Sequence, residues 1–128
     1  MPLSIISTLK GNLFMRGLPF LKMKKAVLGE RYVLSVVFVG NARSQQLNKK
    51  YRGKDKPSNV LSFPLSLSEG EIFINPLCAK KDAIAFHVTP RKMLGILFIH
   101  GLLHLKGTRH GSTMEQAEKK FQKRFSLF

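Results

Sequence analysis

Three histidines lie close together near the C-terminal end of the chain, in the stretch HGLLHLKGTRH. His100 and His104 are four residues apart, so on a helix their imidazoles leave the same face and can reach one ion. Gly107 allows the chain to leave that helix with a backbone conformation that other residues resist, and His110 can then return toward the same point. The spacing predicts a metal site with three imidazole ligands.

Three neutral imidazoles suit zinc, and a site with three protein ligands leaves a fourth position open to water. Water held there would have a pKa near about 7 and could supply a hydroxide nucleophile. The alternative is that the histidines are ordinary core residues. Against it, three of the chain's four histidines fall within eleven residues, and unpartnered imidazoles are costly to bury in an apolar helix. We therefore predict one Zn²⁺ per chain and expect His87, outside this spacing, to be an ordinary loop residue.

The histidine spacing also matches the metzincin protease pattern, H-E-x-x-H-x-x-G-x-x-H. Gly101 stands where those proteases carry the glutamate that serves as their general base. Without that carboxylate, peptide hydrolysis by the usual route is disfavoured. The pattern therefore predicts a zincin-like scaffold with a different chemistry.

A basic segment, NKKYRGKDKPSNVLSFP, runs from Asn48 to Pro64. Its cations surround Tyr51, and such a mixture can bind phosphates while offering one aromatic face for stacking. The ordinary alternative for a basic loop is simple solvation. The candidate phosphate-binding residues in this segment are Lys49, Lys50, Arg52, Lys54 and Lys56.

The charge of the whole chain is strongly unbalanced. It has 22 Lys and Arg against 7 Asp and Glu, a formal net charge of +15. Such a surface attracts polyanions, for which nucleic acid is the common case and an anionic membrane surface the rarer one. The longest strongly apolar stretch, Met93 to Leu105, is shorter than the roughly 20 residues that span a bilayer. We expect a nucleic-acid partner and no membrane partner.

The single cysteine, Cys78, excludes an internal disulfide and favours a reducing compartment. We expect a cytoplasmic protein. An organellar matrix is the alternative, because the N-terminal segment has several cations and no acid before Glu30, a composition that a mitochondrial presequence permits. Cys78 lies in an apolar stretch and is expected to be a buried small residue rather than a nucleophile.

The chain length of 128 residues fits one domain, 1–128. Strands mostly precede helices, which predicts an α+β fold: a mixed β-sheet packed with helices, and the metal-binding helix in the C-terminal half. Pro64 places part of its strand at an edge or a bulge.

Strands are predicted at Leu3–Ser7, Tyr32–Val39, Val60–Leu67 and Glu71–Ile74. Helices are predicted at Leu9–Leu28 (interrupted near Gly17 and Pro19), Ala42–Tyr51, Leu77–Phe86, Pro90–Lys106 and from Ser112, the last with a buried stripe of Met114, Ala117, Phe121 and Phe125.

Capping residues predict where the helices begin. Asn41 is a plausible N-cap for the second helix. Thr89 and Pro90 open the metal-binding helix as N-cap and first residue. Ser112 and Glu115 have the spacing of a capping box at the start of the last helix.

Together, the two motif segments resemble the YbeY family of metal-dependent endoribonucleases and ribosomal RNA maturation factors. The family's motifs run close to N-x-x-Y-R-x-K-D-x-P-T-[DN]-V-L-S-F-P, then G-[DE]-I, then H-G-x-L-H-L-x-G-x-D-H. This chain has NKKYRGKDKPSNVLSFP, GEIFIN and HGLLHLKGTRH in the same order. The resemblance implies a zincin-like α+β fold and a bacterial or organellar setting. It also implies processing of single-stranded RNA, in 16S rRNA maturation linked to the small ribosomal subunit.

The resemblance carries over residue by residue. His100, His104 and His110 match the family's metal ligands, and Arg52 matches its arginine near the metal. An arginine fork there would bind the scissile phosphate and oppose the charge that develops in the transition state. Ser62 lies in the strand expected beside the metal and could hydrogen-bond the metal's water, or it could simply satisfy backbone groups.

The chain departs from the family pattern just before the third histidine. Arg109 stands where the family usually has an acid, and Thr108 replaces its usual aromatic residue. If that acid orients a metal ligand, its role is lost here or filled elsewhere. Arg109 would weaken metal affinity as a neighbouring cation, or add a contact to phosphate.

The leading hypothesis is a zinc-dependent endoribonuclease that acts on single-stranded rRNA in rRNA processing and ribosome assembly. The alternative is a non-catalytic rRNA-binding assembly factor whose zinc is structural, since the same charges and histidines serve both functions. A metalloprotease is disfavoured by Gly101. No general acid or base is evident in the sequence.

Overall fold

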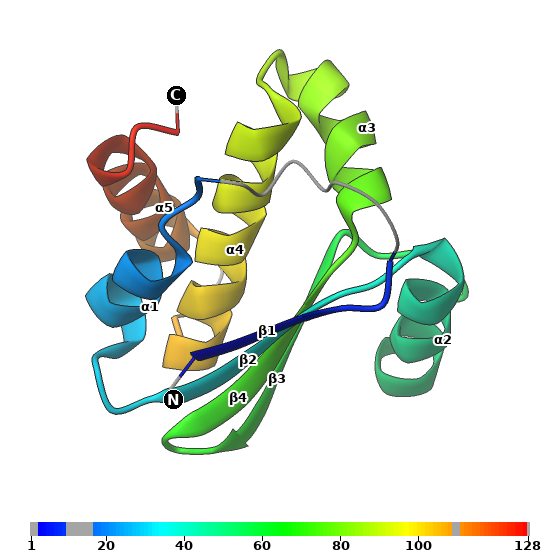
Figure 1. The fold of residues 1–128 in the computed structure, drawn as a ribbon, viewed down its shortest axis with the longest axis horizontal. Helices are drawn as coiled ribbons and strands as arrows, with labels where there is room; N and C mark the ends of the chain where they lie inside the picture. The colour runs from blue at the N-terminus through cyan, green and yellow to red at the C-terminus, as the bar shows by residue number, and fades with distance from the viewer. Residues whose placement is uncertain (1–2, 10–16, 109–110, 128) are drawn as a thin grey trace.

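The computed structural model describes residues 3–9, 17–108 and 111–127, which form four strands and five helices. The α+β class predicted from the sequence is confirmed (Figure 1). The strands are β1 (Leu3–Ser7), β2 (Val33–Phe38), β3 (Val60–Ser66) and β4 (Glu69–Ile74). The helices are α1 (Phe20–Leu28), α2 (Asn41–Arg52), α3 (Pro76–Phe86), α4 (Pro90–Lys106) and α5 (Ser112–Arg124).

The strands form one mixed sheet in the order β1-β2-β4-β3. β1 and β4 both run parallel to β2, whereas β3 pairs antiparallel with β4 through a tight turn. β3 is therefore an edge strand. Its ladder is irregular between Pro64 and Ser66, which confirms the predicted edge or bulge and has a simple cause: proline has no N–H to donate.

The helices divide between the two sides of this sheet. Figure 1 shows α1, α3, α4 and α5 on one side, with α4 between the other three, and α2 by itself on the other side. Alternation along β2 explains the larger layer, because Leu34, Val36 and Phe38 are buried and successive side chains of a strand point to opposite faces. α4 packs across the buried face of β3 and β4.

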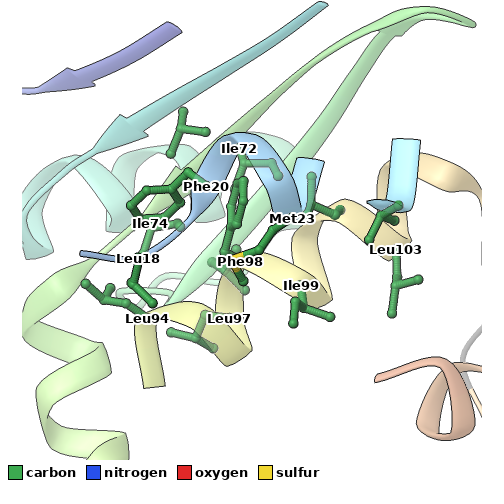
Figure 2. Close-up of a cluster of buried hydrophobic side chains, with 14 of the residues drawn as sticks. Leu18, Phe20, Met23, Ile72, Ile74, Leu94, Leu97, Phe98, Ile99 and Leu103 are labelled. Carbon is green, nitrogen blue, oxygen red and sulfur yellow. The ribbon is translucent and has the colours of Figure 1, made fainter. Parts of the chain in front are cut away.

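α4 is the core helix, as its apolar sequence predicts. Residues on nearly every side of it are buried, including Leu94, Phe98 and Leu102. Figure 2 shows Phe20 and Met23 of α1 lying against Phe98, and the rings of Phe20 and Phe98 meet edge to face at 4.9 Å between centroids, a favoured aromatic geometry. Within the described residues, no helix is long and apolar enough to cross a membrane.

The predicted ends of α4 are confirmed. The Thr89 hydroxyl accepts a hydrogen bond from the backbone N–H of Lys92, and Pro90 is the first helical residue. Gly107 ends the helix at φ +88°, in the left-handed region that favours glycine. The helix that carries His100 and His104 is thus held in register at both ends by local sequence.

Two other predicted caps are wrong. α2 begins at Asn41, after Gly40, without a side-chain cap, because the Asn41 amide oxygen instead accepts a hydrogen bond from Asn75. α5 begins after Gly111, again without a side-chain cap, so Ser112 is already helical and the capping box with Glu115 does not form. The predicted first helix, Leu9–Leu28, is helical only from Phe20 among the described residues.

Gly101 marks a close approach between α4 and the sheet. A Cβ atom at this position would lie 3.0 Å from Ser62 Oγ and 3.1 Å from Ile72 Cδ1. A side chain at this position fits only if the side chains of Ser62 and Ile72 give way by a few tenths of an ångström. The glutamate of the metzincin pattern is therefore disfavoured by close packing as well as absent from the sequence.

Restoring that glutamate with Gly101→Glu is expected to destabilise the fold by at least about 3 kcal/mol, because it overpacks the contact and buries an unpaired carboxyl group. Urea unfolding followed by circular dichroism measures the loss. Lys106→Glu is the control, an exposed change on the same helix that should cost at most about 1 kcal/mol. Equal losses in the two variants would show that α4 and the sheet are not in close contact at Gly101.

Candidate functional site

His100 and His104 face each other on α4 as their spacing predicts. Their Nε2 atoms are 3.1 Å apart, and their ring centroids are 4.6 Å apart. Both rings are partly buried. Because the two residues are four apart on one helix, a single α-helical turn is enough to bring the two ring nitrogens to one point.

This geometry suits a zinc ion. Two imidazole nitrogens that bind one tetrahedral zinc at about 2.0–2.1 Å lie roughly 3.3 Å from each other, close to the 3.1 Å between the Nε2 atoms here. The third predicted ligand, His110, and its neighbour Arg109 lie outside the described residues. Within the described ranges, no three histidine, cysteine or acidic side chains come together to hold a metal ion.

Glu118 of α5 lies on the other side of the His100 ring. Its Oε1 atom is 3.3 Å from His100 Nδ1, and both side chains are largely buried. A carboxylate that accepts a hydrogen bond from Nδ1–H fixes the tautomer that leaves Nε2 free to bind a metal, and it orients the ring. Glu118 therefore occupies the role that a ligand-orienting acid would fill, and it comes from α5 instead of position 109.

A cleft of about 530 Å³ opens beside the two histidines. Its lining brings Arg52, at the end of α2, together with His100 and His104 of α4. α2 and α4 lie on opposite faces of the sheet (Figure 1), so they share a cleft only because β3 is an edge strand that the cleft passes over. The residues between them are Tyr51, Asn59, Val60, Leu61, Ser62 and Phe63.

The hydroxyl group of Ser62 hydrogen-bonds to the protein backbone. Its Oγ atom donates a 3.0 Å hydrogen bond to the backbone carbonyl of Gly101. This contact favours the second of the two roles expected from the sequence, the satisfaction of a backbone group. The bond joins β3 to α4 one residue beyond His100 and so helps to fix the height of the histidines above the strand.

Aromatic rings form part of the cleft wall on the side of α2. Tyr51 is exposed and tilts against Phe63 with 5.0 Å between ring centroids, and Phe63 in turn meets Phe73. The Tyr51 ring is therefore held in place from behind and open in front. Such a surface can stack an unpaired base, in keeping with the role expected for Tyr51.

The lysines of the basic segment are exposed and stand outside the lining of this cleft. Lys49 Nζ lies 3.9 Å from Asp55, and Lys50 Nζ lies 5.2 Å from the Tyr51 ring. Lys54 and Lys56 follow in the loop after α2. They form a cationic border beside Arg52 and not a direct part of the histidine cleft.

Hydrogen bonds between α2 and the following loop fix the shape of this cationic border. The buried Asn48 donates a 2.9 Å hydrogen bond to the carbonyl of Lys56, and Gln45 donates one of 2.9 Å to Asp55. These contacts fold the loop back onto α2. The segment therefore contains its own hydrogen bonds, which hold the loop after Arg52 against α2.

Cys78 is half-buried and has no nucleophilic environment. Its pKa is raised above the ordinary value by burial first and by the nearby Asp82 carboxylate second, so the thiol stays protonated at neutral pH. It lies within a polar cluster in which Asn75 caps α3 and contacts Asn41. The prediction that Cys78 is a buried small residue is wrong about its burial, because the thiol is only half-buried and contacts the polar side chains of Asn75 and Asn41.

Sequence reasoning missed Glu118 as a partner of the metal-binding helix. One signal was available: Glu118 follows Met114 by four residues and precedes Phe121 by three, so it lies on the buried face of α5. A carboxylate on an apolar stripe needs a partner. Which partner it has depends on how α5 packs against α4, and the sequence does not contain that information directly.

Comparison with known proteins gives a consistent match over most of the chain. A family profile described as "Endoribonuclease YbeY" matches residues 12–127. A protein of Thermotoga maritima named "Endoribonuclease YbeY" is 36% identical over 101 residues, which cover 77% of this chain and 67% of that protein. One of Acholeplasma laidlawii with the same name is 39% identical over 93 residues, covering 70% of this chain and 68% of that protein.

The fold has a counterpart among solved structures. The solution structure of TM1509 from Thermotoga maritima superposes with a TM-score of 0.70 at 30% identity, over 96% of this chain and 88% of that one. The likeness therefore includes the sheet and the helices that carry the histidines and Arg52.

Replacing Ser62 by Ala should lower the free energy of unfolding by about 1 kcal/mol, because it removes one partly buried hydrogen bond between β3 and α4. The measurement is urea unfolding, with Ser4→Ala in the exposed strand β1 as the control. If Ser62→Ala were as stable as the control, the bond to the Gly101 carbonyl would not contribute to the position of α4.

Proposed function

The chain belongs to the YbeY endoribonuclease family, and from this we propose that it cuts single-stranded RNA at a zinc site formed by His100, His104 and His110. Membership of the family makes the chain an endoribonuclease, a hydrolase whose substrate is RNA. Zinc dependence, the preference for single strands and a role in rRNA maturation are the proposed refinements. The observation that carries the proposal is the cleft in which Arg52 faces the convergent Nε2 atoms of the two described histidines.

The zinc ion, when bound, would supply Lewis acidity toward a phosphate oxygen and would lower the pKa of a water molecule. The two described ligand nitrogens already converge at 3.1 Å, so little rearrangement of α4 is required. His110 completes the proposed set. Glu118 keeps the His100 ring in the orientation and tautomer that metal binding needs.

Arg52 is placed to handle the charge of the substrate. It lines the same cleft as His100 and His104, where its planar fork can bind two phosphate oxygens at once. Negative charge grows on those oxygens in the transition state, so a fixed cation there stabilises the transition state more than the ground state.

The remaining wall of the cleft favours an unpaired strand. The exposed ring of Tyr51 is braced by Phe63 and can stack on a base only when that base is not already stacked within a duplex. The lysines beside Arg52 would bind neighbouring phosphates without regard to sequence. These features support single-stranded RNA as the proposed substrate, and the family resemblance extends the proposal to rRNA of the small ribosomal subunit.

Cleavage of an end-labelled single-stranded rRNA fragment tests the proposal. We expect zinc-loaded wild type to cut the fragment and His104→Ala to lose at least about a hundredfold in rate, because one ligand nitrogen is removed. His87→Asn is the control, because it changes an exposed histidine with φ +57° to a residue that tolerates this conformation. Circular dichroism and RNA binding establish that both variants fold.

The same experiment separates the two functions expected from the sequence. If the wild type makes no cuts, or if His104→Ala makes the same cuts, the metal-dependent nuclease is refuted. Retained RNA binding in that case supports the non-catalytic assembly factor with a structural zinc.

The role of Glu118 is tested by metal affinity and not by activity. Glu118→Gln should weaken zinc binding by about 10- to 100-fold, because the amide is a poorer acceptor for the Nδ1–H of His100. Competition with a chromophoric chelator measures the affinity. Glu115→Gln is the matched control, an exposed acid one turn earlier on the same helix; equal zinc affinity in the two variants would contradict the role of Glu118.

A further inference from the structure

A second pocket lies on the other side of His100 from the cleft. It has a volume of about 490 Å³ and is bounded by α3, α4, α5 and the start of β3. This volume is within the range of small-molecule sites, about 300–1,000 Å³. Two of its lining residues, His100 and Glu118, belong to the proposed metal site, and the proposed cleavage chemistry does not use the rest of the pocket.

The charge of this pocket is opposite to that of the whole chain. Two of the chain's seven acids, Asp82 and Glu118, line it, and none of its described lining residues is lysine or arginine. A phosphate group would be repelled here. The pocket therefore suits a neutral group that donates hydrogen bonds, because carboxylate oxygens are acceptors only.

Gln122 of α5 presents an unpaired amide to the same space. The residue is only 7% exposed and lines the pocket, and no side-chain hydrogen bond in the described part of the chain involves its amide, which keeps some solvent exposure. An amide in this state points to a ligand, because it can donate and accept at once and so pair with the edge of a planar base.

The walls of the pocket are apolar and include one exposed aromatic ring. Val88, Met93 and Ile96 provide flat aliphatic surface, and Phe86 at the rim is 70% exposed. A large exposed aromatic side chain beside an apolar hollow can stack on a ring that enters it.

The pocket adjoins the cleft that Arg52 lines. Asn59, Val60 and His100 line both. An RNA strand whose scissile phosphate binds beside Arg52 and the histidines therefore has this apolar pocket next to it. The base of a neighbouring nucleotide can enter the pocket, whereas a phosphate group is repelled by its acids.

We propose that this pocket, formed by Asp82, Phe86 and Gln122, receives one unpaired RNA base next to the scissile phosphate and favours bases that carry an amino group. The inference rests on the proposed function and adds a base preference to it. Asp82 accepts from the exocyclic amino group, Gln122 bonds the rest of the base edge, and Phe86 covers the ring. Asn59 donates to Asp82 Oδ2 at 3.0 Å and holds that carboxylate in place.

Cytosine and uracil test the preference, because uracil has a carbonyl acceptor where cytosine has an amino donor. The probes are fluorescein-labelled hexauridylate and six hexamers with one cytosine each, titrated with the full chain and checked for integrity afterwards. We expect one cytosine position to bind about tenfold more tightly than hexauridylate. Asp82→Asn should abolish that difference, whereas Glu115→Gln, with the same change of charge outside the pocket, should keep it.

Two further variants probe the ring and the amide. Phe86→Ala should weaken binding of the preferred hexamer by about fivefold or more, while Ile84→Ala, which is equally exposed on the same helix but outside the pocket, should not. Gln122→Met should weaken binding as well, yet melt at the wild-type temperature or above, because the amide that it removes makes no hydrogen bond to the described residues.

Equal affinity for all hexamers, or equal binding by Phe86→Ala and Ile84→Ala, would overturn the proposal. A Gln122→Met variant that lowers the melting temperature and leaves binding intact would also overturn it, because the amide would then be structural. These readouts are independent of cleavage: metal-dependent cutting without a base preference refutes the pocket alone. A base preference without metal-dependent cutting supports the pocket and refutes the nuclease.

Discussion

The position of β3 at the edge of the sheet is the constraint on which the site depends. A central strand would separate α2 on one face from α4 on the other. Because β3 has a neighbour on one side only, Arg52 from α2 and the histidines from α4 meet across its open edge. Pro64 and the irregular ladder beside it reinforce that arrangement, since a strand that lacks a donor is poorly suited to further pairing.

The height of α4 above that edge is set by small groups. Gly101 allows the helix backbone to approach Ser62 and Ile72, and the hydroxyl of Ser62 ties the Gly101 carbonyl to the strand. The position that serves as general base in the protease pattern is thus used here for close packing. The histidine spacing is shared with those proteases, but the described residues that line the cleft beside the histidines include a cation, Arg52, and no carboxylate.

Electrostatic contrast divides the groove into two parts on either side of His100. The cleft toward Arg52 is cationic and suits phosphate, whereas the pocket toward α3 and α5 gathers two of the few acids in a chain of net charge +15. One of those acids, Glu118, also contacts His100 Nδ1. A single residue thereby links α4 to the wall of the neighbouring pocket, so the cleft and the pocket share a structural element.

The sequence alone determined the local features of this protein. Four-residue spacing places His100 and His104 on one helical face, Thr89 and Gly107 delimit their helix, and alternation or turn residues locate the strands, because each of these features depends on neighbours in the chain. The motifs also indicated the family and Arg52. Local rules gave wrong caps at Asn41 and Ser112, because a tertiary hydrogen bond to Asn75 engages the first and Gly111 precedes the second in the N-cap position.

Only the tertiary structure decided that Glu118 meets His100, that Ser62 bonds Gly101, and that Gln122 faces an acidic pocket. The two hydrogen-bond contacts join residues 18 and 39 positions apart, and the pocket is lined from separate helices. These arrangements follow from the packing of α4 between the sheet and α5, which no short stretch of sequence encodes.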